Sequence, residues 1–541
     1  MRIKTGIPMS AEHVPGLPKR VDIYDTTLRD GSQQEGLSLS VEDKLKVARQ
    51  LDSLGVAYIE GGWPGANPKD EEFFKRAPNE LKLTTAKLVA FGSTRRATTR
   101  ADQDPTLRSL VEANTSSVCI VGKAWDYHVE KALRTTLDEG VRMVADSVAF
   151  LRGHGIDVFL DAEHFFDGYK SNPKFTLEIL KAAEDSGART LVLCDTNGGT
   201  LPHEVEEILG TIGPLYSAEI GVHFHNDSGC AVANALAAVR MGATHVQGCI
   251  NGYGERTGNA DLSVTIPNLS LKMNVESVPR DRIELISAVS RHVAEIVNIN
   301  LDPQKPYVGT SAFAHKAGLH VSAITRRRDA YEHISPEFVG NGSRFVVSEM
   351  SGKSTLAIKA AELGLELNSD ELGGVVEHLK ELEHKGYHFE AADGSLELLM
   401  RQASGWKQHF FTLESFRVIT DHREDIGVVT EATVKVIVEG SRMIATAEGN
   451  GPVNALDSAL RKALSPYFEK LSKVHLTDFR VRVLDSALGS GAVVRVLLDS
   501  SDGNDTWSTM GVSENIIDAS WQALVDSIVM GLIKVAEKPS I

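Results

Sequence analysis

The sequence predicts an α/β protein: a (β/α)8 TIM barrel followed by a helical linker subdomain and a C-terminal α+β domain. Three observations predict the barrel. Eight short apolar runs alternate with amphipathic stretches between residues 21 and 254. Many of these stretches end in glycine, which commonly terminates a helix. Polar residues suited to chemistry lie at or just after the ends of the apolar runs, as expected where strand ends form one face of a barrel.

Hydrophobic periodicity places the individual elements. Short apolar runs predict buried strands, and apolar residues at helical spacing predict the helices between them. The predicted strands are residues 21–24, 57–60, 87–91, 117–121, 157–160, 190–193, 219–223 and 245–249. The helical patterns include residues 41–54, 175–186 and 231–241, and the glycines after helices are Gly55, Gly155, Gly187 and Gly242. Eight strands with intervening helices favour a closed barrel over a shorter doubly wound sheet.

We expect four segments along the chain. Residues 1–20 form an N-terminal tail, and residues 21–275 form the barrel. Residues 276–405 read as a mostly helical subdomain, because their periodic apolar residues must be buried. Residues 406–541 form a β-rich module in which a strand–turn–helix order occurs twice, which suggests an internal duplication. Its predicted elements are strands 432–438, 479–483 and 493–498 and helices 453–464 and 514–532.

Composition limits the classes of partner. The chain of 541 residues carries 57 Lys and Arg against 73 Asp and Glu, a formal net charge of −16, which disfavours binding to nucleic acid or anionic membranes. The four cysteines form no CxxC pair, so we expect a reducing, cytoplasmic compartment. The N-terminal stretch has three prolines and no apolar core, so we expect no signal peptide there. No apolar run is expected to approach the length of a membrane span.

Two histidines of the seventh predicted strand and an aspartate after the first predict a metal site. His223 and His225 are two residues apart, so the strand period places both side chains on one face, which in a barrel can be the inner face. Asp30 supplies an oxygen ligand from the first strand. This set leaves positions open for substrate and water, and its mixed nitrogen and oxygen donors admit Mg²⁺, Mn²⁺, Zn²⁺ or Co²⁺.

Three other residues extend the candidate site. Arg29 adjoins Asp30, and we interpret it as a fixed cation aimed at a carbonyl or enolate oxygen rather than as a simple partner of a barrel carboxylate. Glu163 ends the fifth strand, and its role is open between a general base, an orienter of a water ligand and a hydrogen-bonded core group. The loop at residues 252–260 lacks GxGxxG spacing, which excludes a dinucleotide site, and it can bring Asn259 to the metal.

Two features outside the barrel give little evidence of function by themselves. Residues 351–355 read Ser-Gly-Lys-Ser-Thr, like the end of a phosphate-binding loop, but Val347 stands where the first glycine of that motif belongs, so we reject an ATPase. His320 and Tyr331 would be ordinary surface residues from spacing alone.

Several motifs together resemble those of the Claisen-condensing acyl-CoA enzymes, a family that includes 2-isopropylmalate, homocitrate and citramalate synthases. The shared segments are residues 25–31 (Asp-Thr-Thr-Leu-Arg-Asp-Gly), 223–227 (His-Phe-His-Asn-Asp), 254–259 (Gly-Glu-Arg-Thr-Gly-Asn) and 317–320 (Ala-Gly-Leu-His). The resemblance covers nearly the whole chain from about residue 20 to 535. Residues 60–70 are most similar to the citramalate synthase branch. Residues 449–455 and 507–517 resemble the family's leucine/isoleucine-sensing regulatory domain.

The resemblance implies roles for particular residues. The implied metal ligands are Asp30, His223 and His225, with Asn259 near or on the ion. Arg29 would stabilise the developing oxyanion, and Thr196 would hold the carboxylate of a 2-oxo acid. His320 and Tyr331 match residues that the family supplies to a neighbouring subunit's active site. This match implies an obligate homodimer. It also implies that His320 and Tyr331 are active-site residues rather than the ordinary surface residues that their spacing suggests.

The implied reaction is acyl transfer in isoleucine biosynthesis. Acetyl-CoA would condense with pyruvate to give (R)-citramalate and CoA, with isoleucine as an inhibitor bound by the C-terminal domain. Glu163 and the His320–Tyr331 pair are the candidates for the base that removes a proton from acetyl-CoA. The alternatives are a larger 2-oxo acid, as in 2-isopropylmalate or homocitrate synthesis, a lyase that cleaves an acyl-CoA, and an inactive amino-acid-sensing scaffold.

Three departures from related patterns bear on the substrate. Homocitrate synthases have a glutamate two residues before the first metal histidine, where this chain has Gly221. The related lyases carry a reactive cysteine in the loop after the eighth strand, and this loop has none. Position 161 is an aspartate, whereas another citramalate synthase branch places an aromatic residue there.

Overall fold

The computed structural model describes residues 14–316, 318–347, 351–406, 409–423, 427–484 and 491–537. The chain divides into two compact units. The first comprises Met1–Phe313 and Glu332–Ser343, and the second comprises Ala314–Tyr331 and Arg344–Ile541.

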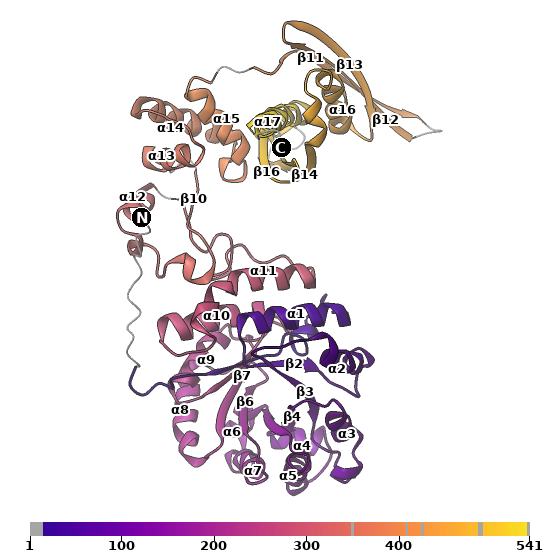
Figure 1. Ribbon diagram of the computed structural model, residues 1–541, viewed down its shortest axis with the longest axis vertical. Coiled ribbons are helices and arrows are strands. Elements are labelled where there is room, and N and C mark those ends of the chain that lie inside the picture. The colour runs from indigo at the N-terminus through magenta and orange to yellow at the C-terminus, as the bar shows by residue number, and fades with distance from the viewer. Residues whose placement is uncertain are drawn as a thin grey trace. The chain divides into compact units, whose positions relative to one another are not determined.

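The first unit contains a closed barrel of eight parallel strands in sequential order (Figure 1). The strands are β1 (Asp22–Asp25), β2 (Tyr58–Gly62), β3 (Lys87–Ser93), β4 (Ser117–Lys123), β5 (Asp157–Glu163), β6 (Thr190–Asp195), β7 (Glu219–Phe224) and β8 (His245–Gly248). The barrel closes where β8 pairs with β1, with Asp22 opposite His245 and Asp25 opposite Gly248. Each predicted strand is present, and the predicted fold class is confirmed.

Helices surround the strands (Figure 1). They are α1 (Val41–Leu54), α2 (Pro68–Glu80), α3 (Pro105–Glu112), α4 (Asp126–Lys131), α5 (Leu137–Gly153), α6 (Phe165–Ser171), α7 (Pro173–Asp185), α8 (Pro202–Ile212), α9 (Ala231–Arg240), α10 (Leu262–Pro267) and α11 (Ile286–Val297). α1 has the predicted bounds because both ends are marked: Ser40 and Asp43 form a capping box, and Gly55 stops the helix at φ +92°.

The barrel interior is packed with side chains. An aromatic cluster fills it, with Tyr24, Tyr58 and Phe159 in ring contact and Val89 and Cys119 buried beside them. A larger apolar core lies between the strands and the helices. Since the interior is filled, a ligand site belongs at an end of the barrel, where the loops follow the strands.

The second unit begins with helices and a small sheet. β9 (Ala314–His315) pairs with β10 (Arg344–Phe345) in parallel, and the helices are α12 (Gly318–Arg326), α13 (Lys353–Glu362), α14 (Ser369–His384) and α15 (Asp393–Ala403). α13, α14 and α15 contribute to one apolar core through Leu356, Leu379 and Met400. The periodic apolar residues of this region are therefore buried, as the sequence predicts.

The C-terminal part repeats one arrangement twice. The first copy is β11 (Thr412–Arg423), β12 (Gly427–Val438), β13 (Ser441–Gly449) and α16 (Pro452–Leu464). The second is β14 (His475–Val483), β15 (Val494–Ser501), β16 (Thr506–Ser513) and α17 (Ile516–Glu537). Each copy is a three-stranded antiparallel sheet followed by a helix, which supports the predicted duplication.

The expectation about apolar runs is wrong for α17. Its residues Ile516–Val535 are long and apolar enough to cross a membrane by length and composition. The helix instead contributes buried side chains such as Leu524 and Ile528 to the core of the C-terminal sheets. A buried core helix passes the same test, so this helix is weak evidence for a membrane span.

Candidate active site and metal centre

The predicted site residues of the barrel line one cavity. Its volume is about 630 Å³, a size typical of small-molecule sites. The sequence-predicted residues in its wall are Arg29, Asp30, Glu163, Thr196, His223 and His225. They come from the carboxyl ends of β1, β5, β6 and β7 and the turns that follow. The barrel thus brings together residues that are far apart in the sequence, as the strand-end argument predicts.

The proposed metal-ligating atoms converge on one point. His223 Nε2 lies 3.2 Å from Asp30 Oδ2, and His225 Nε2 lies 3.7 Å from the same oxygen. The two Nε2 atoms are 3.4 Å apart, and all three side chains are buried. Ligands at right angles around an ion at about 2.1 Å would be about 3 Å apart, so the spacing fits a single divalent ion.

The local charges favour metal-binding forms of two of these groups. Burial alone would raise the pKa of Asp30, but the Arg29 guanidinium and the imidazoles hold that pKa well below its ordinary value. Burial and the neighbouring His223 lower the pKa of His225 to about 4. Burial would lower the pKa of His223, but Asp30 outweighs it and raises that pKa. At neutral pH a metal ion would therefore meet an ionised Asp30 carboxylate and a neutral His225.

Asn259 stays a candidate for a further oxygen ligand, because its side-chain oxygen is buried without a partner in the described residues. It is buried and lies opposite His225 in an isolated β-bridge. Its Nδ2 donates to the carbonyl of Tyr253 at 3.0 Å, whereas its Oδ1 is buried with no hydrogen-bond partner within the described chain. A buried carbonyl oxygen without a donor is unfavourable, and a cation would satisfy it.

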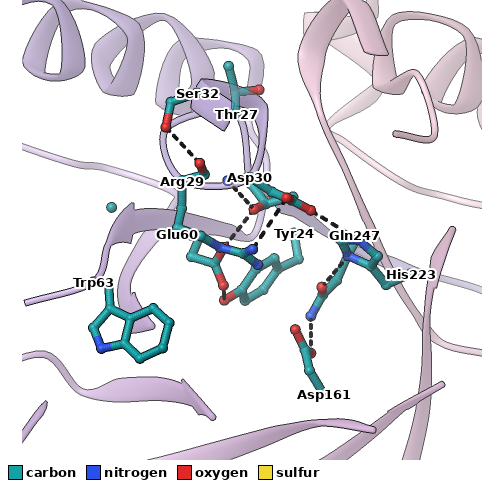
Figure 2. A network of polar contacts seen from close by, with 12 residues as sticks. Tyr24, Thr27, Arg29, Asp30, Ser32, Glu60, Trp63, Asp161, His223 and Gln247 are labelled. Carbon is teal, nitrogen blue, oxygen red and sulfur yellow. Dashed lines mark hydrogen bonds and ion pairs between the residues drawn. The ribbon is translucent and has the colours of Figure 1, made fainter. Parts of the chain in front are cut away.

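Arg29 is fixed by a buried carboxylate that the sequence reasoning missed. Its Nε donates to Glu60 Oε2 at 2.6 Å (Figure 2). Its guanidinium lies over the Phe91 ring, 3.9 Å from the centroid. Glu60 is fully buried and also accepts hydrogen bonds from Tyr24 and Thr26, at 2.7 and 2.6 Å. A glutamate at the carboxyl end of a buried strand was the signal that could have found it.

Glu163 is half-buried and forms an ion pair with Lys123. The two residues are register partners on β5 and β4, so their side chains leave neighbouring strands at the same level. Both line the cavity, which favours a role toward a ligand over that of a core group. Its function as a base or as an orienter of water stays a prediction.

Thr196 lies in the cavity wall just after β6. Its hydroxyl accepts a hydrogen bond from the backbone N–H of His164 at 2.9 Å and keeps its own hydrogen for a ligand oxygen. Arg256, paired with Asp227, donates to the Thr196 carbonyl at 2.8 Å and so ties the loop after β8 to this position. The proposed contact between Thr196 and a carboxylate stays a prediction.

His320 and Tyr331 belong to the second unit. His320 lies on α12, and its ring stacks on that of Tyr331 with 4.1 Å between centroids. The structure thus brings these two residues together, although they are separated by α12 and the turn after it. Their part in an active site stays a prediction.

The class of protein follows from fold and site. A TIM barrel with a cavity at the strand ends, a convergent carboxylate–imidazole set and a fixed arginine defines a barrel enzyme with a candidate divalent-metal centre.

Comparison with known proteins narrows this class. The HMGL-like family model matches residues 20–290, the homocitrate synthase post-HMGL domain-like model matches residues 307–387, and the LeuA allosteric (dimerisation) domain model matches residues 390–532. The chain belongs to the HMGL-like family.

Similar curated proteins cover nearly the full chain. An (R)-citramalate synthase of Streptomyces coelicolor is 50% identical, over 96% of this chain and 98% of that protein. One of Aquifex aeolicus is 49% identical, over 96% and 99%. A 2-isopropylmalate synthase of Pyrococcus furiosus is 31% identical, over 95% and 99%. The chain is therefore an acyl-transferring, condensing enzyme, as predicted.

Proposed function

We propose that this protein is an (R)-citramalate synthase. It condenses acetyl-CoA with pyruvate and hydrolyses the thioester, so that acetyl-CoA, pyruvate and water give (R)-citramalate and CoA. The observation that carries the proposal is the convergence of Asp30, His223 and His225 beside the fixed Arg29 guanidinium. The two relatives about half identical to this chain carry the same name, which favours pyruvate over larger 2-oxo acids.

The residues of the cavity can divide the work of this reaction. A divalent ion held by the convergent set would act as a Lewis acid and template for the oxygens of pyruvate. The Arg29 guanidinium takes up charge on the keto oxygen as the new carbon–carbon bond forms. The Thr196 hydroxyl donates to the pyruvate carboxylate. Burial of the convergent set keeps these charges in a low dielectric, where each interaction is stronger than in water.

The proton of the acetyl methyl group has two candidate acceptors in this proposal. Glu163 faces the cavity as a carboxylate paired with Lys123. The His320–Tyr331 pair is the other candidate. Hydrogen exchange from acetyl-CoA into D2O separates them, because loss of the base abolishes exchange as well as condensation. If Glu163 is the base, the Glu163→Gln protein should not exchange. If the His320–Tyr331 pair is the base, the His320→Ala protein should not exchange.

Free CoA release measured with a thiol reagent tests the function and its rivals. We expect kcat/KM to be highest with pyruvate and about 10²-fold lower with 2-oxoisovalerate, because a pocket shaped for a methyl group must exclude an isopropyl group. Faster turnover of 2-oxoisovalerate or 2-oxoglutarate would replace citramalate by isopropylmalate or homocitrate synthesis. Cleavage of citramalyl-CoA to acetyl-CoA would indicate a lyase, and no release with any acid would indicate an inactive scaffold.

A homodimer with shared active sites predicts complementation between inactive variants. We propose the dimer because the LeuA dimerisation domain model matches the C-terminal part and because His320 and Tyr331 would complete the partner's site. His223→Ala and His320→Ala proteins are each expected to be inactive, and mixing them under subunit exchange should restore about a quarter of normal activity. This fraction is expected because half the dimers are mixed and each mixed dimer has one intact site. A mixture as inactive as its components would rule out sharing.

Isoleucine is the proposed inhibitor bound by the C-terminal domain. Saturating isoleucine is expected to lower kcat/KM by about 5- to 100-fold, with valine as a control of similar chemistry. The full chain is needed, because Ser395 of α15 donates to Asp526 of α17 at 2.7 Å and a truncation near Arg401 would remove that packing. Calorimetry and the CoA assay measure binding and inhibition together. Binding without inhibition, or no binding, would remove the regulatory proposal.

The proposed compartment is the cytoplasm. All four cysteines are free, and three are buried. This fits a reducing environment.

A further inference from the structure

A hydrogen-bonded chain leads away from the metal side of His223. His223 Nδ1 lies 2.9 Å from Gln247 Oε1, and Gln247 Nε2 lies 2.9 Å from Asp161 Oδ1 (Figure 2). All three residues are buried, with exposed fractions of 5% for His223, 1% for Gln247 and 4% for Asp161. His223 and Gln247 are register partners on β7 and β8, so their close contact is set by the barrel itself.

Chemistry fixes the direction of this chain. An ionised carboxylate only accepts hydrogen bonds, so Asp161 must face the NH2 group of Gln247. If the amide were reversed, two oxygens would lie in contact and the amide NH2 would face the imidazole. With the NH2 group on Asp161, the Gln247 oxygen faces His223 and must accept a proton from Nδ1. His223 Nε2 is then the unprotonated nitrogen of the neutral ring, and it faces Asp30 and His225.

Other contacts support an acceptor at position 161. Burial raises the pKa of Asp161 to about 6, and the nearby Arg29 guanidinium opposes that rise. Cys119 Sγ on β4 lies within 4.8 Å of a carboxylate oxygen of Asp161. The second metal histidine lacks such a chain, since His225 Nδ1 is buried with no partner within the described residues. Asp161 on β5 and Gln247 on β8 thus fix the orientation of the His223 imidazole. No comparable chain fixes the His225 imidazole within the described residues.

We propose that Asp161 and Gln247 are positioning residues for the metal: the carboxylate orients the amide, and the amide holds His223 in the tautomer whose Nε2 can bind a divalent cation. The inference rests on the proposed function, because it concerns the same metal site. It also gives Asp161, which lines the cavity, a role in the metal site. Partners of this kind typically change metal affinity 10- to 100-fold when removed.

The test measures Mn²⁺ affinity of the metal-stripped, full-length protein by competition with a chelator. Gln247→Leu, of similar size but without an acceptor, is expected to raise the dissociation constant about 10- to 100-fold. Asp161→Asn is expected to weaken Mn²⁺ binding. An asparagine side chain can both donate and accept, so it would no longer force the Gln247 oxygen to face His223. Adding Gln247→Glu to Asp161→Asn should restore affinity to within about threefold, because the asparagine then donates to a carboxylate that accepts from His223.

Two controls separate positioning from stability. Gln103→Leu changes an exposed glutamine of the same unit and should leave Mn²⁺ affinity unchanged. Thermal unfolding of each metal-free variant reports folding, and a purely structural role would lower Tm without a selective loss of affinity. If Gln247→Leu fails to fold, the comparison of Asp161→Asn with the double variant decides the question.

The outcomes are distinguishable from failure of the function itself. Unchanged Mn²⁺ affinity in Gln247→Leu, or a double variant no tighter than Asp161→Asn, would overturn the positioning role while leaving the synthase proposal intact. A wild-type protein that binds no Mn²⁺ and releases CoA with no 2-oxo acid would instead remove the proposed function.

Discussion

Asp30→Ala is expected to lower the rate of CoA release by about 10³-fold or more, because binding of the ion supplies several kcal/mol of transition-state stabilisation. Asp30 is the carboxylate of the convergent set, and its Oδ2 faces both imidazoles. Without it two neutral or cationic rings remain, a poor site for Mg²⁺ or Mn²⁺, which prefer oxygen ligands. Mn²⁺ affinity should therefore fall together with activity, measured on the same preparations.

The matched control for this variant is Asp102→Ala, an exposed aspartate of the barrel unit. It should retain both Mn²⁺ affinity and turnover. His223→Ala should behave like Asp30→Ala, since both remove a proposed ligand of the same ion. If Asp30→Ala retained Mn²⁺ at wild-type affinity, the carboxylate would have no place in the metal site.

Arg29→Ala is expected to lower kcat about 10²- to 10³-fold while Mn²⁺ affinity changes little. The guanidinium contacts Asp30 at 3.4 Å but lies outside the convergent ligand set. Removing it also leaves Glu60 as an unpaired buried carboxylate, so the free energy of unfolding should fall by about 3 kcal/mol. Arg29→Lys keeps a charge but loses the fixed fork, and should recover only part of the rate.

Glu60→Gln separates the two effects of Arg29. It leaves the guanidinium in place but weakens its anchor, and a misplaced cation is expected to cost up to about 10²-fold in kcat. Arg240→Ala, an exposed arginine on α9, serves as the control for loss of a surface charge. Near-normal turnover of Arg29→Ala in a folded protein would contradict the assigned role.

The barrel was predictable because its signals are local. Each strand is a short apolar run, and α1 has the bounds that apolar periodicity and Gly55 predict. In the C-terminal part, β11, β13 and β16 were not predicted, although β12 and both helices were. β13 buries one side chain, Ala445, so its sequence shows little apolar periodicity.

The sequence predicted those site residues whose type and position relative to a strand indicate a ligand. His223 and His225 share a face by strand period alone, and Asp30 follows a strand end. Glu60 and Gln247 act through contacts to Arg29 and His223 that depend on strand order and register. Hydrophobic periodicity does not give the register between neighbouring strands. The contacts of Glu60 on β2 with Arg29, and of Gln247 on β8 with His223, could therefore be found only in the structure.

The central claim is that Asp30, His223 and His225 hold one divalent cation. The most direct measurement is the anomalous difference density of a crystal grown with Mn²⁺. The account predicts one peak about 2.1–2.3 Å from Asp30 Oδ2, His223 Nε2 and His225 Nε2, distances ordinary for such ligands. A crystal with these side chains ordered and no peak between them would contradict the claim, and with it the proposed condensation.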